Sequence, residues 1–363
     1  MLFVILLTML VVFPENSISL EHRIIKVAIL DAFIPSFDSP ENAKKALDGY
    51  TWKSGNKIYT IDVEWISDLK IITGFLRNYD VLLIPGIGKE FRRIGKFSLW
   101  KENIRRFVKG GGGYVGMCGG ANLAVKGFVP YSERGWSNPT LWEWCMSRSC
   151  LGLIEALSYQ DMADPFACSV IWKDPSRVGI SAFIWYNLSW KGVGLSLDLR
   201  INKSHPLFSG YDKEYVKMRW NSGPAFVLLD KNVSVIAWYP KVDLSLTAWR
   251  YVGPLSRDFL KQRSLDFWDK SNKRINFTIS GLPAAISSKY GKGRVVIFGP
   301  HPEHPVQINE RIQESRDTNG NRIFFGGRLY RKFFSYEDIS HNWWLLRRSV
   351  AWAAGIAEED LPS

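Results

Sequence analysis

The tightest constraint on the fold of this chain comes from five residues, Gly116-Met117-Cys118-Gly119-Gly120. Residues 114–117 form a short apolar run of strand length, and residues 119–125 resemble the start of a helix, so Cys118 lies at a strand-to-helix turn. Glycine two residues before and after the cysteine is typical of a turn too tight for neighbouring side chains. Such a turn raises the sulfur above the carboxyl end of a sheet, where the following helix N-terminus favours the thiolate. The segment therefore predicts an α/β fold with a nucleophilic cysteine.

Short apolar runs alternate with helical segments along the rest of the chain. The runs predicted as strands are residues 24–30, 81–84, 114–117, 193–199, 226–229, 233–238 and 294–298. The segments predicted as helices or turns are residues 43–47, 66–75, 99–109, 119–125 and 343–354, with Gly110 and Gly355 at helix ends. This rhythm predicts a mostly parallel, doubly wound sheet with helices on both faces. We expect one domain, residues 20–356, with insertions at about residues 240–280 and 306–335 and a tail at residues 357–363.

A second polar motif, Gly299-Pro300-His301-Pro302-Glu303, follows the last predicted strand. A cysteine nucleophile needs a base within hydrogen-bond reach and a third group that orients the base. His301 and Glu303 are two residues apart, so in extended backbone their side chains emerge on the same side. A lone cysteine is usually a small buried hydrophobe, and a lone His-x-Glu is usually a surface pair. Because both motifs lie at the carboxyl ends of strands, together they predict a catalytic triad of Cys118, His301 and Glu303. His304 is the alternative base, or it lines the pocket.

Glycine-rich segments near the cysteine raise two further hypotheses. An oxyanion formed at Cys118 needs backbone donors, and we expect the N–H of Gly119 and one within Pro85-Gly86-Ile87-Gly88 to supply them. The spacing Gly111-x-Gly113-x-x-Gly116 also matches a dinucleotide-binding fingerprint. That fingerprint must follow a strand and open a helix, whereas these glycines follow a helix and open a strand. The dinucleotide interpretation therefore fails.

These motifs resemble the class I glutamine amidotransferase-like superfamily, whose triad is an elbow cysteine and a His-x-Glu after a late strand. Within that superfamily, the chain most resembles the glutaminase-like N-terminal domain of biotin–protein ligases and its stand-alone microbial relatives. It rests on Gly112 to Ala121, on Trp220-Asn221-Ser222-Gly223-Pro224, and on Tyr290 to Arg294 followed by His301-Pro302-Glu303. The resemblance implies a flavodoxin-like sheet with its active site at the carboxyl edge, and it places Asn221 and Gly223 near the pocket.

The chain also departs from that family. Glutaminases carry Gln four residues after the cysteine, where it helps to hold the substrate, and this position is Asn122. No phosphate-binding Walker loop occurs, so we expect no ATP-dependent synthetase partner within the chain and no cofactor. No Cys-x-x-Cys pair occurs either, and we expect no metal. Glutamine-dependent biosynthesis is therefore disfavoured even though the triad fits.

The first residues have the features of an export signal. Residues 2–13 are apolar apart from Thr8, and Ser17-Ile18-Ser19 offers the small residues that a signal peptidase reads. A membrane-spanning helix needs about 20 apolar residues, so this run is short for an anchor. We therefore expect residues 1–19 to be a signal peptide and the protein to be extracytoplasmic. The alternative is an uncleaved membrane anchor, because the run lacks a preceding Lys or Arg.

Charge and cysteine content restrict the partners less strongly. The net charge is +12, but the basic residues are scattered and no nucleic-acid motif accompanies them, so we interpret them as a solvated surface. Cys145, Cys150 and Cys168 either share one disulfide or remain buried thiols.

Two functions follow from these observations. The first is an exported, stand-alone cysteine-dependent amidohydrolase or peptidase-like enzyme, acting on a small-molecule or peptide amide. The second is a catalytically silent binding module for a glycan, peptide or anionic polymer, with the Trp-rich residues 130–190 as its contact surface. Thiol reactivity separates them, because only the enzyme needs a reactive Cys118.

Overall fold

A computed structural model describes the chain in several stretches. These are residues 20–31, 39–86, 97–129, 147–159, 195–220, 223–241, 246–248, 250–251, 268–269, 275–277, 281–307, 311–314, 330–333 and 339–363. The predicted signal peptide, residues 1–19, lies outside them, as do Cys145, Cys168 and most of the Trp-rich residues 130–190. Among the described residues, no helix has the length and apolar composition needed to cross a membrane.

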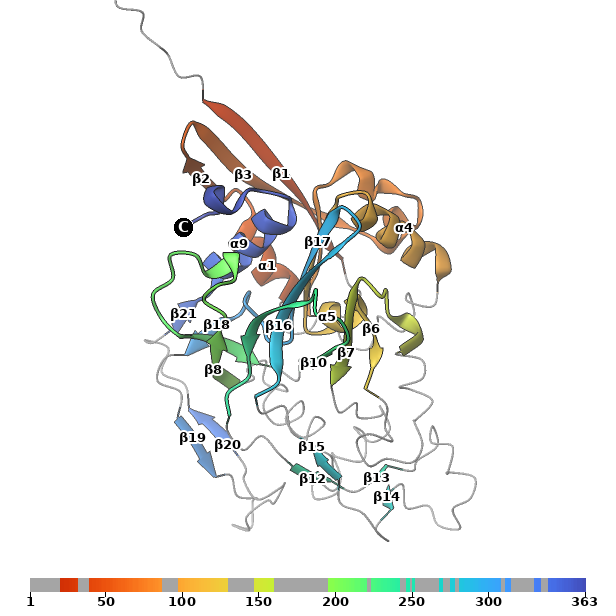
Figure 1. The fold of residues 1–363 in the computed structure, drawn as a ribbon, viewed down its shortest axis with the longest axis vertical. Helices are drawn as coiled ribbons and strands as arrows, with labels where there is room; N and C mark the ends of the chain where they lie inside the picture. The colour runs from red at the N-terminus through yellow and green to blue at the C-terminus, as the bar shows by residue number, and fades with distance from the viewer. Residues whose placement is uncertain are drawn as a thin grey trace, which may run out of the picture.

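A ten-stranded sheet forms the body of the molecule (Figure 1). Its centre consists of five parallel strands, in spatial order β3 (Lys57–Ile66), β1 (Glu21–Leu30), β4 (Val81–Ile84), β5 (Gly113–Met117) and β17 (Gly293–Phe298). Numbered along the chain, this order is 2-1-3-4-5, which is the order of flavodoxin-like sheets. The predicted doubly wound α/β class is confirmed.

Antiparallel strands extend this centre on both sides and make the sheet mixed. β2 (Thr51–Ser54) pairs with β3 at one edge. Beyond β17 the sheet continues through β16 (Pro283–Tyr290), β11 (Ser234–Trp238), β8 (Leu195–Ile201) and β9 (Tyr215–Trp220). The sequence predicted β8 and β11 but missed β2, β3, β9 and β16. The expected helix or turn at residues 66–75 was partly wrong, because Ile66 is the last residue of β3.

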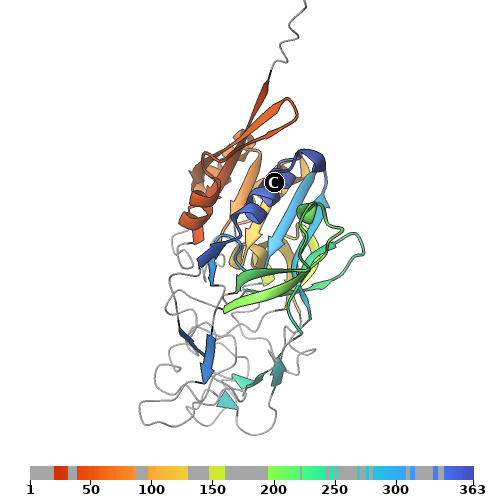
Figure 2. The ribbon, with the colours of Figure 1, turned by 90° about the vertical axis from the view of Figure 1, so that its left-hand side faces the viewer.

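Helices cover both faces of the sheet, as Figure 2 shows. α1 (Ser39–Leu47) and α9 (Trp343–Ala353) lie on one face. The other face carries α2 (Asp68–Ile72), α4 (Ser98–Lys109) and α5 (Gly119–Ala124). α4 turns Trp100, Ile104 and Val108 inward at four-residue spacing, which places them on one side of a helix.

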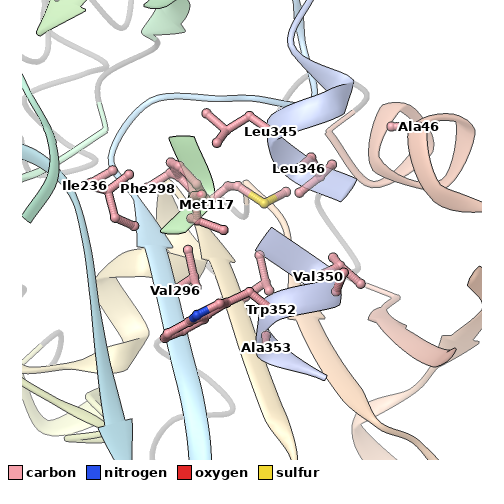
Figure 3. Close-up of a cluster of buried hydrophobic side chains, with 14 of the residues drawn as sticks. Ala46, Met117, Ile236, Val296, Phe298, Leu345, Leu346, Val350, Trp352 and Ala353 are labelled. Carbon is pink, nitrogen blue, oxygen red and sulfur yellow. The ribbon is translucent and has the colours of Figure 1, made fainter. Parts of the chain in front are cut away.

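Each face has its own hydrophobic core. On the α9 side, Leu345, Leu346 and Val350 pack over Met117 of β5 and Phe298 of β17 (Figure 3). Every residue of β4 is buried, which is typical of a parallel strand covered on both faces. The carboxyl ends of β5 and β17 are therefore held rigidly side by side.

The remaining elements are short. A second sheet has the order β10 (Ala225–Leu228), β7 (Ile154–Tyr159) and β6 (Val125–Phe128). The paired two-stranded sheets are β12 (Leu246–Ala248) with β15 (Ile275–Phe277), β13 (Arg250–Tyr251) with β14 (Trp268–Asp269), β18 (Pro305–Gln307) with β21 (Ile339–His341), and β19 (Arg311–Glu314) with β20 (Tyr330–Phe333). Short 3-10 turns are η1 (Phe75–Asn78), η5 (Pro206–Phe208) and η7 (Glu358–Asp360).

The tail, residues 357–363, packs against the sheet edge. In η7 the carboxylate of Asp360 accepts hydrogen bonds from the side chains of Ser54 (2.7 Å), Lys57 (3.0 Å) and Tyr59 (2.9 Å). The indole of Trp52 donates to the Asp360 carbonyl at 2.8 Å. These bonds tie the end of the chain to β2 and β3.

Candidate active site

Cys118 occupies a strained turn between β5 and α5. Its backbone has φ 49° and ψ −105°, and it is the one non-glycine residue with positive φ in the described part of the chain. Such strain persists only where the surrounding structure enforces it, and it is concentrated at functional sites. A Cβ on Gly116 would lie 2.7 Å from the Gly120 carbonyl oxygen, and one on Gly120 would lie 2.0 Å from that of Ile84. The predicted reason for both glycines is confirmed.

His301 and Glu303 lie beside this turn, at the end of β17. The Cys118 N–H donates to the Phe298 carbonyl at 2.8 Å, which joins the elbow to the last residue of β17. The His301 N–H donates to the Arg219 carbonyl of β9 at 2.7 Å. His301 Nδ1 donates to Glu303 Oε1 at 2.6 Å, and both side chains are fully buried. The two side chains therefore form the hydrogen-bonded pair that a base and its orienting group would need.

The charges of the site reinforce one another. Burial alone would lower the pKa of His301, but the Glu303 carboxylate and the charge of the Cys118 sulfur outweigh it and raise the pKa to about 10. Burial would raise the pKa of Glu303, but the charge of His301 and the hydrogen bonds from His301 and Ser39 hold it below its usual value. His301 is therefore an imidazolium and Glu303 a carboxylate at neutral pH.

The other ring nitrogen of His301, Nε2, lies across the ring from the bond to Glu303. Since Nδ1 bonds to Glu303, Nε2 is the atom left for Cys118. Nε2 is buried, and Cys118 is close enough to raise the pKa of the ring. This arrangement can pass a proton between the Cys118 thiol and Nε2.

The predicted oxyanion donors are only partly described. The Gly86 N–H donates to Ser39 Oγ at 2.8 Å, so in this structure it is not directed at an oxyanion. Gly86 instead makes room for the base, because a Cβ there would lie 2.7 Å from His301 Cε1. Ile87 and Gly88 lie outside the described residues. Gly119 is buried as the first residue of α5, where the helix itself offers its N–H no acceptor.

His304 has a different environment from His301. Burial lowers the pKa of His304 to about 4, so the ring is neutral at pH 7. Asn42 Nδ2 lies 2.9 Å from His304 Nδ1, and because an amide N–H can only donate, the neutral ring carries its proton on Nε2. Its Nε2 is 3.9 Å from Glu303 Oε1, too far for a hydrogen bond. Of the two histidines, His301 is therefore the one that is hydrogen-bonded to Glu303.

The same three side chains offer the donor atoms for a metal ion. One atom each from His301, Glu303 and His304 lies within 4.8 Å of the other two. The two imidazole rings are inclined by only 32° with centroids 4.7 Å apart, whereas a shared ion must lie in both ring planes. His301 Nδ1 is also already bonded to the carboxylate. The arrangement suits a triad better than a metal centre.

Two of the predicted substrate-binding residues have structural contacts. A Cβ on Gly223 would lie 1.6 Å from the Gly299 carbonyl oxygen, so glycine allows the segment after β9 to touch the turn that carries His301. Asn122 is buried, and its Oδ1 accepts a hydrogen bond from Ser158 Oγ of β7 at 2.6 Å. Asn221 lies outside the described residues.

Sequence reasoning missed four residues that adjoin Cys118 or the segment from His301 to His304. Ser39 Oγ donates to Glu303 Oε1 at 2.5 Å, and Asn42 bonds to His304. Tyr239 donates to the Pro224 carbonyl at 2.9 Å, and its pKa is raised by burial and then by the charge of Cys118. Arg219 adjoins His301 through the backbone. The Ser39-Pro40-Glu41 sequence is a helix-start signal, but nothing local connects it to His301.

Comparisons with known proteins give weak similarities. No known family model matches the chain, and no curated protein matches its sequence. A solved structure described as a glutamine amidotransferase has 16% identity and a TM-score of 0.39, over 76% of this chain and 90% of that one. A ThuA-like protein from Bacteroides uniformis has 11% identity and a TM-score of 0.40, over 80% and 86%. A Thermoplasma acidophilum protein described as part of a GMP synthase has 8% identity and a TM-score of 0.37, over 78% and 87%. These values assign the chain to no family, and the narrower resemblance to biotin–protein ligases stays a prediction.

Proposed function

We propose that this chain is a cysteine-dependent hydrolase of amide bonds, in which Cys118 is the nucleophile, His301 the base and Glu303 the group that orients the base. The observation that carries the proposal is the buried 2.6 Å hydrogen bond from His301 Nδ1 to Glu303, beside the strained elbow of Cys118. Structural ion pairs also occur in proteins, but a strained cysteine beside an oriented imidazolium matches the requirements of nucleophilic catalysis.

The proposed reaction has two stages. The Cys118 thiolate attacks the amide carbonyl, and the resulting oxyanion accepts a hydrogen bond from the Gly119 N–H. The imidazolium of His301 then gives its Nε2 proton to the leaving amine as the C–N bond breaks, which leaves a thioester and a neutral imidazole. His301 next removes a proton from water, and the hydroxide attacks the thioester. Collapse of that intermediate releases the carboxylic acid and restores the thiolate–imidazolium pair.

The resting charges support this order of proton transfers. The acid step needs a proton on His301 before the amine leaves, and Glu303 stabilises that proton. The substrate class we propose is a small-molecule or peptide amide, hydrolysed without ATP.

We also propose that the enzyme acts outside the cytoplasm. The support is the apolar run at residues 2–13 followed by Ser17-Ile18-Ser19. β1 begins at Glu21, so removal of residues 1–19 would leave every described element intact.

A silent binding module is the second candidate, and burial of the site favours it. Cys118 is 9% exposed and His301 is 0% exposed, so catalysis would need an approach by which a substrate reaches a nearly buried sulfur. A module that had lost catalysis would keep the fold without needing that approach.

Covalent trapping distinguishes the two candidates. The protein is incubated with peptide aldehydes and other electrophilic analogues of amides, and the modified residue is mapped by mass spectrometry. The hydrolase should be modified at Cys118, and His301→Ala should lose most of the modification while keeping its folded circular dichroism spectrum. Modification spread over other residues, or none in either protein, would favour the binding module.

A further inference from the structure

We propose that Ser39 is a positioning residue of this site, whose hydroxyl holds Glu303 ionised and in place against His301. The proposal rests on the proposed function, because it assigns Ser39 a role in that triad. Ser39 is the first residue of α1, is fully buried, and lies 264 residues before Glu303 in the chain.

The direction of the hydrogen bonds is fixed by the chemistry of their ends. The backbone N–H of Gly86 can only donate, so Ser39 Oγ is the acceptor of that 2.8 Å bond. An ionised carboxylate can only accept, so the hydroxyl proton of Ser39 lies in the 2.5 Å bond to Glu303 Oε1. The same carboxylate oxygen accepts from His301 Nδ1 at 2.6 Å. A chain of three hydrogen bonds therefore runs from the turn after β4 to the base.

The Ser39 hydroxyl opposes the effect of burial on the ionisation of Glu303. Burial disfavours the charged carboxylate; the charge of His301 does most to hold the pKa of Glu303 down, and the hydrogen bond from Ser39 adds to it. Hydrogen bonds to a charged group are stronger than those between neutral groups. Loss of the hydroxyl should therefore allow Glu303 to protonate at higher pH, and a protonated Glu303 no longer stabilises the imidazolium.

α1 is suited to this task because it presents two side chains to one segment. Asn42 follows Ser39 by three residues, on the same side of the helix, and it bonds to His304. The helix itself is anchored by Ala43, Ala46 and Leu47, which are buried in the core shared with α9. Helix packing thus determines where the Ser39 hydroxyl lies.

The test is the pH profile of Cys118 alkylation by iodoacetamide in the full chain, with modified cysteines mapped by mass spectrometry. Ser39→Ala should move the acid limb of the profile to higher pH and slow alkylation at pH 5 by about tenfold. Ser39→Thr keeps a hydroxyl and should restore the wild-type profile, whereas Ser39→Val has the same shape as the Thr variant without a hydroxyl and should behave like Ser39→Ala. If Ser39→Ala fails to fold, the Thr and Val variants still isolate the hydroxyl from packing.

The matched control is Ser287→Ala, which removes a buried hydroxyl bonded at 2.8 Å to His205, an imidazole outside the proposed site. Its profile should equal that of the wild type even if its thermal stability falls. Equal acid limbs for the Thr and Val variants, with wild-type Cys118 still selectively alkylated, would overturn the role of Ser39 alone. A wild-type Cys118 that resists alkylation would instead overturn the proposed function, and this role with it.

Discussion

The substitution Glu303→Gln separates the charge of the orienting residue from its shape. The amide keeps nearly the same volume and can still accept hydrogen bonds from His301 and from Ser39 Oγ, which donates to Glu303 at 2.5 Å. It removes the negative charge that stabilises the imidazolium. Burial of His301 is unchanged and Cys118 still contributes, so the pKa of His301 should fall from about 10 toward its usual 6.5.

The magnitude follows from the environment of His301. Its pKa in the native protein is about 10, against a usual 6.5. At about 1.4 kcal/mol per tenfold change in proton affinity, this shift is a net preference for the imidazolium on the order of 5 kcal/mol, which is what the Glu303 and Cys118 interactions leave after the cost of burial. If Glu303 supplies about half of this, its loss reduces the proton affinity of His301 by between about 10-fold and 100-fold. A less stable imidazolium is a weaker activating partner for the Cys118 sulfur.

The assay is the rate of Cys118 alkylation by iodoacetamide at pH 6, in the wild type and in Glu303→Gln. We expect the variant to react roughly 10-fold to 100-fold more slowly and His301→Ala to be slower still. Asp360→Asn is the control, because it neutralises a hydrogen-bonded carboxylate on the tail and should leave the rate unchanged. A folded Glu303→Gln protein that is alkylated at the wild-type rate would refute the reasoning.

Three further predictions concern stability and processing. Gly223→Ala should destabilise the fold by roughly 3 kcal/mol or more in urea unfolding, because the new Cβ would lie 1.6 Å from a backbone oxygen. Gly127→Ala is the control and should be nearly neutral, because the nearest atom to its Cβ would be 3.8 Å away. The free energy of unfolding should fall as pH rises from 6.5 through about 10, because His301 binds its proton more tightly in the folded state; a flat profile in His301→Ala would confirm the origin. Amino-terminal sequencing of protein from its native host should begin near Leu20, and a mature chain that retains Met1 would contradict export.

The elbow and the His-x-Glu pair could be predicted because their information is local. The glycines around Cys118 indicate a tight turn. The two-residue separation of His301 and Glu303 predicts that their side chains point to the same side of an extended backbone. The parallel character of the central sheet also followed from the alternation of apolar runs with helices. These features depend on residues close together in the sequence.

What the sequence did not reveal depends on distant contacts or on weak local patterns. Ser39 meets Glu303 only because α1 packs over the sheet, and no pattern near residue 39 indicates that contact. β16 carries two alanines and two serines, which have little strand preference, and it forms a strand because it lies buried between β17 and β11. β3 alternates buried and exposed residues, but charged positions interrupt its apolar run.

The central claim is that Cys118 is a nucleophile activated by His301, and competition between cysteines tests it most directly. The native protein is treated with a limiting amount of iodoacetamide at pH 6, and the modified peptides are quantified. Cys118 should be alkylated first, and Cys150 should stay unmodified, because burial raises the pKa of its thiol to about 12. His301→Ala should abolish that preference. Similar rates for both cysteines, or a silent Cys118 in the folded wild type, would contradict the account.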